Sequence, residues 1–362
     1  MALKTPLCDL LGIDLPIIQA PMAGGPTTPE LVAAVCEAGA LGSFGFAYTQ
    51  PEAIQRAVDE VRARTRAPIN VNIFVNDSIG AIEEADQRGA LDAVAPYYEE
   101  LGLKRPQTVR PPFAPDQNAQ LNALTAIRPD VFTFHLGGVS AARIAAIRAL
   151  GSKIGGSATC VAEAKHLEDL GIDFIIAQGA EAGGHRGTFL RDPYQAMTGT
   201  LALVRLIVRA VKIPVVAAGG IMDGAGIAAA LALGAQGAQL GTAFVTCAES
   251  GASPAHKAAI LSAREDDTLI TEKYSGKPAR GIANRFMREM NARNAPQLPF
   301  PAQSQITGPL RSAAAATGNA DFIALWAGQA APLARALPAA ELIATLRDET
   351  IEALERLARF RG

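Results

Sequence analysis

Eight short apolar runs recur along the chain, and each ends in glycine or other small residues before an alanine-rich stretch with helical spacing. The runs are continuously apolar, which is typical of parallel strands that are buried on both faces. Strands that alternate with helices predict a parallel α/β architecture, and eight such units favour closure into a (β/α)8 TIM barrel over an open sheet. The predicted strands are PIIQAP (16–21), LGSFGF (41–46), INVNIF (69–74), VFTFHL (131–136), KIGGSA (153–158), FIIAQG (174–179), VVAAGG (215–220) and GAQLGT (237–242).

Capping residues mark the ends of several predicted helices. Hydroxyl side chains stand where helices should begin, and glycines stand where they should end. The predicted starts are Thr28, Ser140 and Thr159, and the predicted stops are Gly39, Gly151 and Gly171.

Two stretches interrupt the alternation of strand and helix. Residues 76–125 are longer than one helix and rich in proline near their middle, so we expect the loop after the third strand to cover another part of the molecule. Residues 246–315 follow the eighth strand and mix helical signals with proline-rich segments. We predict that 246–315 form a smaller α/β subdomain inserted into the barrel.

The barrel domain then consists of residues 1–245 and 316–362. Its last helical material is expected at 321–330 and 339–360, where the second segment has amphipathic spacing.

Composition limits the classes of function. The 362 residues are 49% hydrophobic and carry a net charge of −2 with no long run of one sign, so nucleic acid and membrane surfaces are unexpected partners. No apolar stretch is long enough for a membrane span. The four cysteines are far apart and lack metal-ligand spacing, which predicts no metal and a reducing cytoplasmic location. A monomer or a homodimer is expected.

Glycine-rich ends on the last two strands indicate a phosphate site. In (β/α)8 barrels this site is frequently built after strands seven and eight. Gly219 and Gly220 let the backbone approach a ligand closely, while Gly241 and Thr242 offer another glycine, a hydroxyl and the start of a short helix. One such motif would indicate only a tight turn. Two motifs on neighbouring strands predict a phosphate clamp.

One histidine is the best candidate for catalysis. His185 lies in the glycine-rich loop AQGAEAGGHRG after the sixth strand, where an imidazole could act as a general acid or base. His135 lies inside the fourth strand and is either packed in the core or close to the pocket. His166 and His256 are expected at the surface.

Amide side chains and small residues also end at the same face. Asn72 and Gln178 would face the barrel interior, as would Asn70. There each side chain either contacts the edge of a ligand or belongs to a buried polar layer. Pro21 and the small residues around it at the end of the first strand suit a flat ligand, whereas Met22 could be either ligand contact or core.

These segments together resemble the nitronate monooxygenase family, formerly called 2-nitropropane dioxygenases. The resemblance spans most of the chain, and its specificity lies in the combination, since GGHxG also occurs in related FMN-dependent enoyl reductases. The matching segments are QAPMAGG (19–25), VNIF (71–74), TFHLGG (133–138), AQGAEAGGHRG (177–187), residues 214–244 and SGKPARG (275–281).

The resemblance implies a barrel that holds non-covalent FMN. It implies oxidation of alkyl nitronates, above all propionate 3-nitronate, with O2 to an aldehyde or oxo acid plus nitrite or nitrate, through a flavin semiquinone. His185 matches the family's catalytic histidine. The FMN contacts would be Ala20, Pro21, Met22, Asn72, Gln178, Gly183, Gly219, Gly220, Gln239, Leu240, Gly241 and Thr242.

The C-terminal segment expected near the substrate differs from that of one bacterial subgroup of the family, in which two tyrosines and a lysine line the pocket. Asp321, Leu325 and Gln329 stand at the corresponding positions, so Trp326 is a candidate substitute.

Other candidates come from elsewhere in the chain. Tyr274 and Lys277 could reach the site from the insertion, and His135 could border it. Arg186 could pair with a second anionic group of the substrate.

Three other readings stay open. An NAD(P)H-dependent FMN reductase, acting on enoyl-ACP or quinones, would use the same barrel but needs room for nicotinamide. An IMP-dehydrogenase-like enzyme needs a nucleophilic cysteine after strand six, and residues 180–200 contain none. A non-catalytic sensor of a phosphorylated metabolite would be colourless.

Overall fold

Eight parallel strands form a nearly closed barrel in the computed structural model, which describes residues 3–75 and 79–361. Their order is β1-β9-β8-β6-β5-β4-β3-β2, and a parallel bridge between Ile18 and Leu41 joins the two ends. Each strand coincides with one of the eight apolar runs, so the predicted barrel is confirmed. The strands are β1 (Ile17–Gln19), β2 (Gly42–Gly45), β3 (Ile69–Phe74), β4 (Val131–His135), β5 (Lys153–Ala158), β6 (Phe174–Gln178), β8 (Val215–Ala218) and β9 (Gly237–Leu240).

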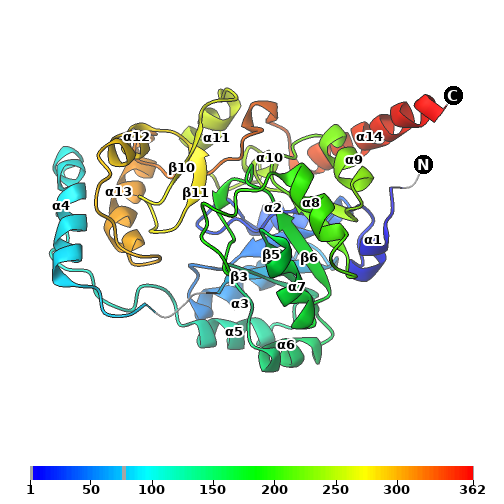
Figure 1. The fold of residues 1–362 in the computed structure, drawn as a ribbon, viewed down its shortest axis with the longest axis horizontal. Helices are drawn as coiled ribbons and strands as arrows, with labels where there is room; N and C mark the ends of the chain where they lie inside the picture. Colours follow the sequence, from blue (N-terminus) through cyan, green and yellow to red (C-terminus); the bar gives the residue numbers. More distant parts are fainter. Residues whose placement is uncertain (1–2, 76–78, 362) are drawn as a thin grey trace.

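Helices surround the barrel, as Figure 1 shows. A short helix that the pattern did not predict, α1 (Pro6–Leu11), packs its Leu7 and Leu11 with Phe174 and Val216 of the strands. The outer helices are α2 (Pro29–Glu37), α3 (Pro51–Arg62), α5 (Gln117–Ala126), α6 (Ala141–Arg148), α7 (Val161–Asp169), α8 (Thr200–Val208), α9 (Gly224–Ala232), the four-residue α10 (Thr242–Val245) and α14 (Ala339–Ala358).

Two of the three predicted helix caps are confirmed. The side chain of Thr28 accepts from the amide of Leu31, and that of Ser140 accepts from Arg143. Thr159 instead precedes the N-cap of α7, and both its amide and its hydroxyl donate to the Glu163 carboxylate at 2.7 Å. A glutamate that reaches back in this way satisfies amide donors at the helix start. The predicted stops Gly39, Gly151 and Gly171 all have positive φ.

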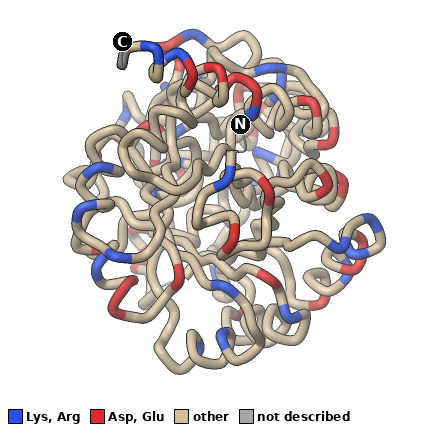
Figure 2. The backbone as a smooth tube through the Cα atoms, turned by 90° about the vertical axis from the view of Figure 1, so that its right-hand side faces the viewer, with Lys and Arg blue, Asp and Glu red and all other residues tan. Residues whose placement is uncertain are grey.

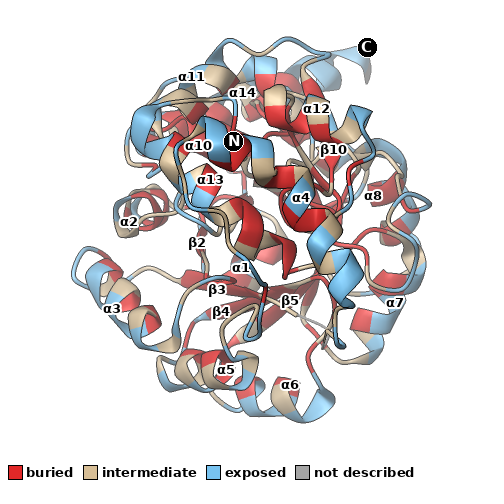
Figure 3. Ribbon diagram, turned by 90° about the vertical axis from the view of Figure 1, so that its left-hand side faces the viewer, coloured by how far each residue is buried: buried red, intermediate tan, exposed pale blue. Residues whose placement is uncertain are grey.

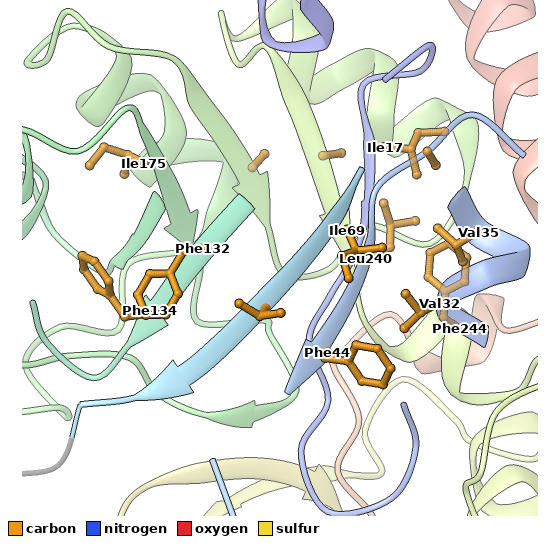
Figure 4. Packing of buried hydrophobic residues seen from close by; sticks show 14 of the residues in the cluster. Ile17, Val32, Val35, Phe44, Ile69, Phe132, Phe134, Ile175, Leu240 and Phe244 are labelled. Atoms are coloured by element: carbon orange, nitrogen blue, oxygen red, sulfur yellow. The ribbon is translucent and has the colours of Figure 1, made fainter. Parts of the chain in front are cut away.

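The barrel core is a single cluster of apolar side chains from strands and helices. Figure 4 shows part of it, with Ile17, Ile69 and Leu240 from strands and Val32 and Val35 from α2. Each fully buried side chain of this size contributes about 1.5–3 kcal/mol to folding. The barrel strands are accordingly buried along their length (Figure 3).

A second apolar cluster lies beyond the barrel and joins segments that are far apart in sequence. Helix α4 (Glu84–Glu100), from the stretch after β3, packs against α13 (Gln303–Thr317), and the Tyr98 hydroxyl donates to the Ile306 carbonyl at 2.8 Å. Figure 1 shows α4 beside α12 and α13 at one end of the molecule. The buried residues of α4 appear in red in Figure 3.

The same region contains a small antiparallel sheet with the order β10-β11-β7. Strand β7 (Gly184–His185) belongs to the loop after β6, so this sheet ties the predicted catalytic histidine to residues 246–315. The other elements are α11 (Pro254–Leu261), β10 (Thr268–Thr271), β11 (Ala279–Ile282) and α12 (Arg285–Ala292). The boundaries 1–245, 246–315 and 316–362 stay a prediction.

The prediction of a helix at 321–330 is wrong. This segment is extended enough to bridge Trp326 to Gly281, and Ile282 donates to the Leu325 carbonyl at 2.8 Å. The Asn284 side chain bonds to the Ile323 carbonyl at 2.8 Å. Because β11 and Asn284 satisfy these backbone groups, tertiary contacts replace a helical ladder. The last helix of the barrel is therefore α14 alone.

Charges of both signs are interspersed over the backbone seen in Figure 2. Within residues 3–75 and 79–361, no helix combines the length and the apolar character needed to cross a membrane. The same residues contain no group of three or more histidine, cysteine, aspartate or glutamate side chains placed to hold a metal.

Candidate active site

A cavity of about 610 Å3 opens at the carboxyl ends of the barrel strands. Residues from the ends of β1, β3, β4, β6, β8 and β9 line one part, and α13 with residues 323–330 line the other. This is the face at which (β/α)8 barrels carry their active sites, and the volume is in the range of small-molecule sites.

A turn of two glycines forms part of the cavity wall. Gly219 and Gly220 have φ of +108° and +70°, and a Cβ on Gly219 would lie 2.9 Å from the Ala182 amide nitrogen. The Thr200 hydroxyl is 2.8 Å from the Gly219 carbonyl and 2.9 Å from the Glu181 carboxylate. The turn is therefore held by its neighbours while its cavity side carries only backbone atoms. We call Gly219, Gly220, Gly241 and Thr242 the glycine cradle.

All but one of the predicted cofactor residues line this cavity. The exception is Leu240, which is 1% exposed and packs in the barrel core, because it points away from its neighbour Gln239 along the strand. The residues that do line the cavity are Ala20, Pro21, Met22, Asn72, Gln178, Gly183, Gly219, Gly220, Gln239, Gly241 and Thr242.

The strand-three asparagines belong to a polar layer across the barrel. The Asn72 amide donates to the Thr133 hydroxyl at 3.0 Å, and that hydroxyl donates to the Asn70 carbonyl oxygen at 3.1 Å. Asn70 in turn donates to Ser43 at 3.0 Å. Asn72 alone of the two asparagines also lines the cavity, so Asn70 belongs to the polar layer only, and ligand contact by Asn72 stays a prediction.

Gln178 braces the loop that carries the histidine. Its amide nitrogen donates to the His185 carbonyl at 3.0 Å, and its carbonyl oxygen accepts from the Gly187 amide at 2.7 Å. His135 adds a second bond to the same His185 carbonyl, with its Nε2 at 3.1 Å. Since a carbonyl only accepts, His135 carries its proton on Nε2.

The His185 ring lies among aromatic side chains on the cavity wall. Its ring centroid is 5.6 Å from that of Phe74, 5.5 Å from Phe300 and 5.8 Å from Trp326, and its Nε2 is 2.9 Å from the Ser275 hydroxyl. Burial lowers the pKa of His185 to about 3, and the neighbouring His135 and the positive charges of Lys277 and Arg311 act in the same direction. The imidazole is therefore neutral at pH 7.

Ser275 fixes which nitrogen of His185 is basic. Its hydroxyl donates to the Lys277 carbonyl at 3.2 Å, so its oxygen accepts from His185 Nε2–H. This arrangement leaves Nδ1 as the atom with a free lone pair. Burial likewise lowers the pKa of His135 to about 4, so it is neutral too.

The substrate candidates divide into two pairs. His135 and Trp326 line the cavity, whereas Tyr274 and Arg186 do not. The Tyr274 hydroxyl donates to the Ile323 carbonyl at 3.1 Å, inside the second apolar cluster.

Arg186 is buried, and its guanidinium donates to backbone carbonyls, including that of Ala196 at 3.0 Å. Arg186 also does not line the cavity, so the geometry gives no support to its expected pairing with a substrate anion.

Positions 321, 325 and 329 contribute nothing to the cavity. Asp321 and Gln329 are exposed, and Leu325 is 2% exposed in the second cluster. His256, expected at the surface, is buried and its Nε2 is 3.0 Å from the Trp326 carbonyl.

Sequence reasoning missed Ser275, Phe300 and Arg311. Ser275 stands between the sequence candidates Tyr274 and Lys277, but its contact with His185 depends on the pairing of β11 with β7. Arg311 had a usable signal, because cavity-lining residues of α13 recur at helical spacing and form one face of the helix. They are Ser304, Gly308, Arg311, Ser312 and Ala315.

The barrel and the cavity at the carboxyl ends of its strands define a (β/α)8-barrel enzyme. Residues 4–349 match a family model described as nitronate monooxygenase. The chain therefore belongs to the nitronate monooxygenase family, a group of flavin-dependent oxidoreductases.

Individual relatives agree with this assignment. The chain is 44% identical to a nitronate monooxygenase of Paraburkholderia phytofirmans, over 99% of this chain and 98% of the relative. It is 44% identical to that of Pseudomonas aeruginosa, over 94% and 97%. Among solved structures it resembles a nitroalkane oxidase from Streptomyces ansochromogenes with a TM-score of 0.90, 39% identity and coverage of 97% and 99%. FabK from Thermotoga maritima is similar with a TM-score of 0.77, 30% identity and coverage of 99% of both chains.

Proposed function

We propose that this chain is an FMN-dependent nitronate monooxygenase, which oxidises alkyl nitronates with O2 to an aldehyde or oxo acid plus nitrite or nitrate. The observation that carries the proposal is that one cavity is lined both by the glycine cradle and by the neutral imidazole of His185. Family membership supports the reaction class.

The residues at the cavity fit a mononucleotide. The cradle exposes backbone to a phosphate, and a side chain in place of Gly219 would clash with the loop at Ala182. The side-chain oxygen of Gln239, Oε1, is buried without a hydrogen-bond partner. A buried acceptor without a partner is costly, and a donor on a bound ligand would remove this cost. We assign the phosphate to the cradle, and Asn72 and Gln239 to the polar edge of the ring. When bound, FMN would supply the electron acceptor and the reaction with O2.

His185 has two roles that depend on the form of the substrate. A neutral nitroalkane must lose its α-proton, and Nδ1 of a neutral imidazole can accept it. A nitronate has already lost that proton, so the imidazole only positions it. The rings of Phe74, Phe300 and Trp326 neighbour His185 and give it apolar surroundings for this step.

The preferred nitronate is proposed separately from the reaction. Propionate 3-nitronate carries a carboxylate besides the nitronate group, and such a dianion needs a cation in the cavity.

The test is to purify the protein, identify its chromophore and assay it with a simple alkyl nitronate. We expect a yellow protein that releases FMN on denaturation, and nitrite formation that tracks oxygen uptake. A colourless protein would point to the sensor. Oxidation of NAD(P)H with no activity on nitronates would indicate the reductase instead. The structural similarity to FabK is the reason to include NAD(P)H in the assay.

A further inference from the structure

Arg311 is a cation in the cavity wall that has no partner. Its Nε is buried with no hydrogen bond, and within residues 3–75 and 79–361 its side chain makes no hydrogen bond or ion pair. The described lining of the cavity contains no aspartate or glutamate. The charge of Arg311 therefore faces a cavity in which nothing from the described chain neutralises it.

Helix α13 presents Arg311 on a face of small and polar residues. Ser304, Gly308 and Ser312 lie on the same face and line the same cavity. A Cβ on Gly308 would lie 3.9 Å from Nη2 of Arg311, so the guanidinium passes over this glycine. The surrounding hydroxyls can donate to an anion bound by the guanidinium.

Arg311 and the glycine cradle are different parts of the cavity wall. The cradle follows β8 and β9, whereas Arg311 belongs to α13. The charge of Arg311 also acts on Tyr48, which follows β2, and on His185. Arg311 is thus a cation additional to the backbone groups of the cradle.

Arg311 is also set apart from the immediate surroundings of the imidazole. The His185 ring neighbours are Phe74, Phe300 and Trp326, and its hydrogen-bond partner is Ser275. Arg311 reaches His185 only through its charge. A substrate held at His185 would therefore meet Arg311 with its other end.

Burial of an unpaired guanidinium is unfavourable, and burial accordingly lowers the pKa of Arg311. A carboxylate matches a guanidinium in charge and shape, because two parallel N–H donors can bind its two oxygens. Such a ligand offsets the cost of leaving the cation unpaired.

We propose that Arg311 is a specificity-determining residue that binds a carboxylate at the end of the substrate remote from the nitronate carbon. This inference rests on the proposed function and extends it by naming the side chain that would recognise a second anionic group of the nitronate.

The test compares two nitronates on the Arg311→Met holoenzyme. One is the nitronate of 3-nitropropionate and the other is the nitronate of 1-nitrobutane, which has a neutral tail. We expect kcat/KM for the carboxylate-bearing nitronate to fall about 30-fold or more, mainly through KM, since a charge-assisted hydrogen bond is lost. For the neutral-tailed nitronate we expect a change of less than about threefold.

Two further variants control for charge and folding. Arg311→Lys keeps the charge without the planar fork, so its preference should lie between those of the wild type and Arg311→Met. Arg66→Met removes the same charge at an exposed position that does not line the cavity, and should leave both substrates unchanged. Flavin content and thermal unfolding check that each variant is folded.

Ligand binding gives a readout that needs no turnover. Trp326 is the only tryptophan of the chain and lines the cavity, so its fluorescence should report anaerobic binding of 3-nitropropionate and 1-nitrobutane. We expect wild type to prefer 3-nitropropionate and Arg311→Met to lose that preference. Equal losses for both ligands, or none, would overturn the proposal. If wild type oxidises neither nitronate, the proposed function fails, and the fluorescence preference still decides the role of Arg311.

Discussion

Two parts of the cavity wall, the glycine cradle and the surroundings of His185, are built in different ways. At the glycine cradle, backbone from consecutive strand ends of the barrel faces the ligand. Around His185, side chains from β3, β7, α13 and residues 275, 300 and 326 meet from distant parts of the chain. The first part suits a cofactor common to many barrels. The second can change substrate by changing side chains, while the barrel stays the same.

The sharpest way to break this comparison is to place a side chain on the cradle. In Gly219→Ala the Cβ would lie 2.9 Å from the Ala182 amide nitrogen, and φ of +108° is strained for alanine. We expect FMN binding to weaken by more than about 100-fold, because backbone hydrogen bonds to a charged phosphate are lost. Flavin per chain after dialysis measures this.

Gly318→Ala is the matched control for the cradle. Gly318 also has positive φ, +69°, but its Cβ would have nothing within 4 Å. It should cost about 1–2 kcal/mol of stability and leave flavin content unchanged. Equal flavin loss in both variants would show that strain, and not the cradle, holds the cofactor.

The surroundings of His185 should separate substrates by their protonation. His185→Asn should lower kcat/KM for neutral nitroalkanes about 100-fold, as expected for loss of a general base. For the corresponding nitronates the loss should stay below about tenfold. His166→Asn, at an exposed position, is the control. Equal losses on both substrate forms would remove the base role.

The buried histidines should make the protein sensitive to acid. Folded pKa values of about 3 for His185 and about 4 for His135 lie below the unfolded value of 6.5. The unfolded chain therefore binds more protons between these values, so stability is full above pH 6.5 and falls as the pH drops toward 4. At pH 4.5 we expect each histidine to account for about 2.5 kcal/mol of lost unfolding free energy.

Urea unfolding at pH 7 and pH 4.5 measures this loss. His185→Asn should flatten the pH dependence, and His166→Asn should not. The same slope in wild type and His185→Asn would contradict the neutral buried imidazole.

The smallest effect should come from the residue that positions His185. Ser275→Ala removes the acceptor for Nε2–H, so the ring can adopt the other tautomer. We expect kcat for neutral nitroalkanes to fall about tenfold with little change in KM. Ser275→Thr keeps the hydroxyl and should restore most of the rate. Ser262→Ala, an exposed serine at the end of α11, should have no effect. A change in KM alone would argue against positioning.

The same comparison explains what the sequence could predict. The strands, the cradle and His185 are written in short local patterns: apolar runs, paired glycines and a glycine-rich loop. Leu240 is the one predicted cofactor residue whose side chain lies outside the cavity, because side chains alternate along β9 and that of Leu240 points into the core.

The other differences between expectation and structure are tertiary in origin. Residues 321–330 read as helical, yet β11 and Asn284 hold them extended. Arg186 looked available beside His185, but the carbonyls it binds become neighbours only when the loop after β6 folds back. Arg311 lies on a helix whose cavity-facing side depends on packing against α4, more than 200 positions earlier in the chain.

The most direct test is anaerobic mixing of the purified holoenzyme with an alkyl nitronate while the visible flavin band is followed. We predict that the nitronate bleaches the band at a rate fast enough for turnover, that oxygen restores it, and that NADH at the same concentration leaves it unchanged. Rapid bleaching by NADH and none by the nitronate would contradict the assignment of this cavity to nitronate oxidation.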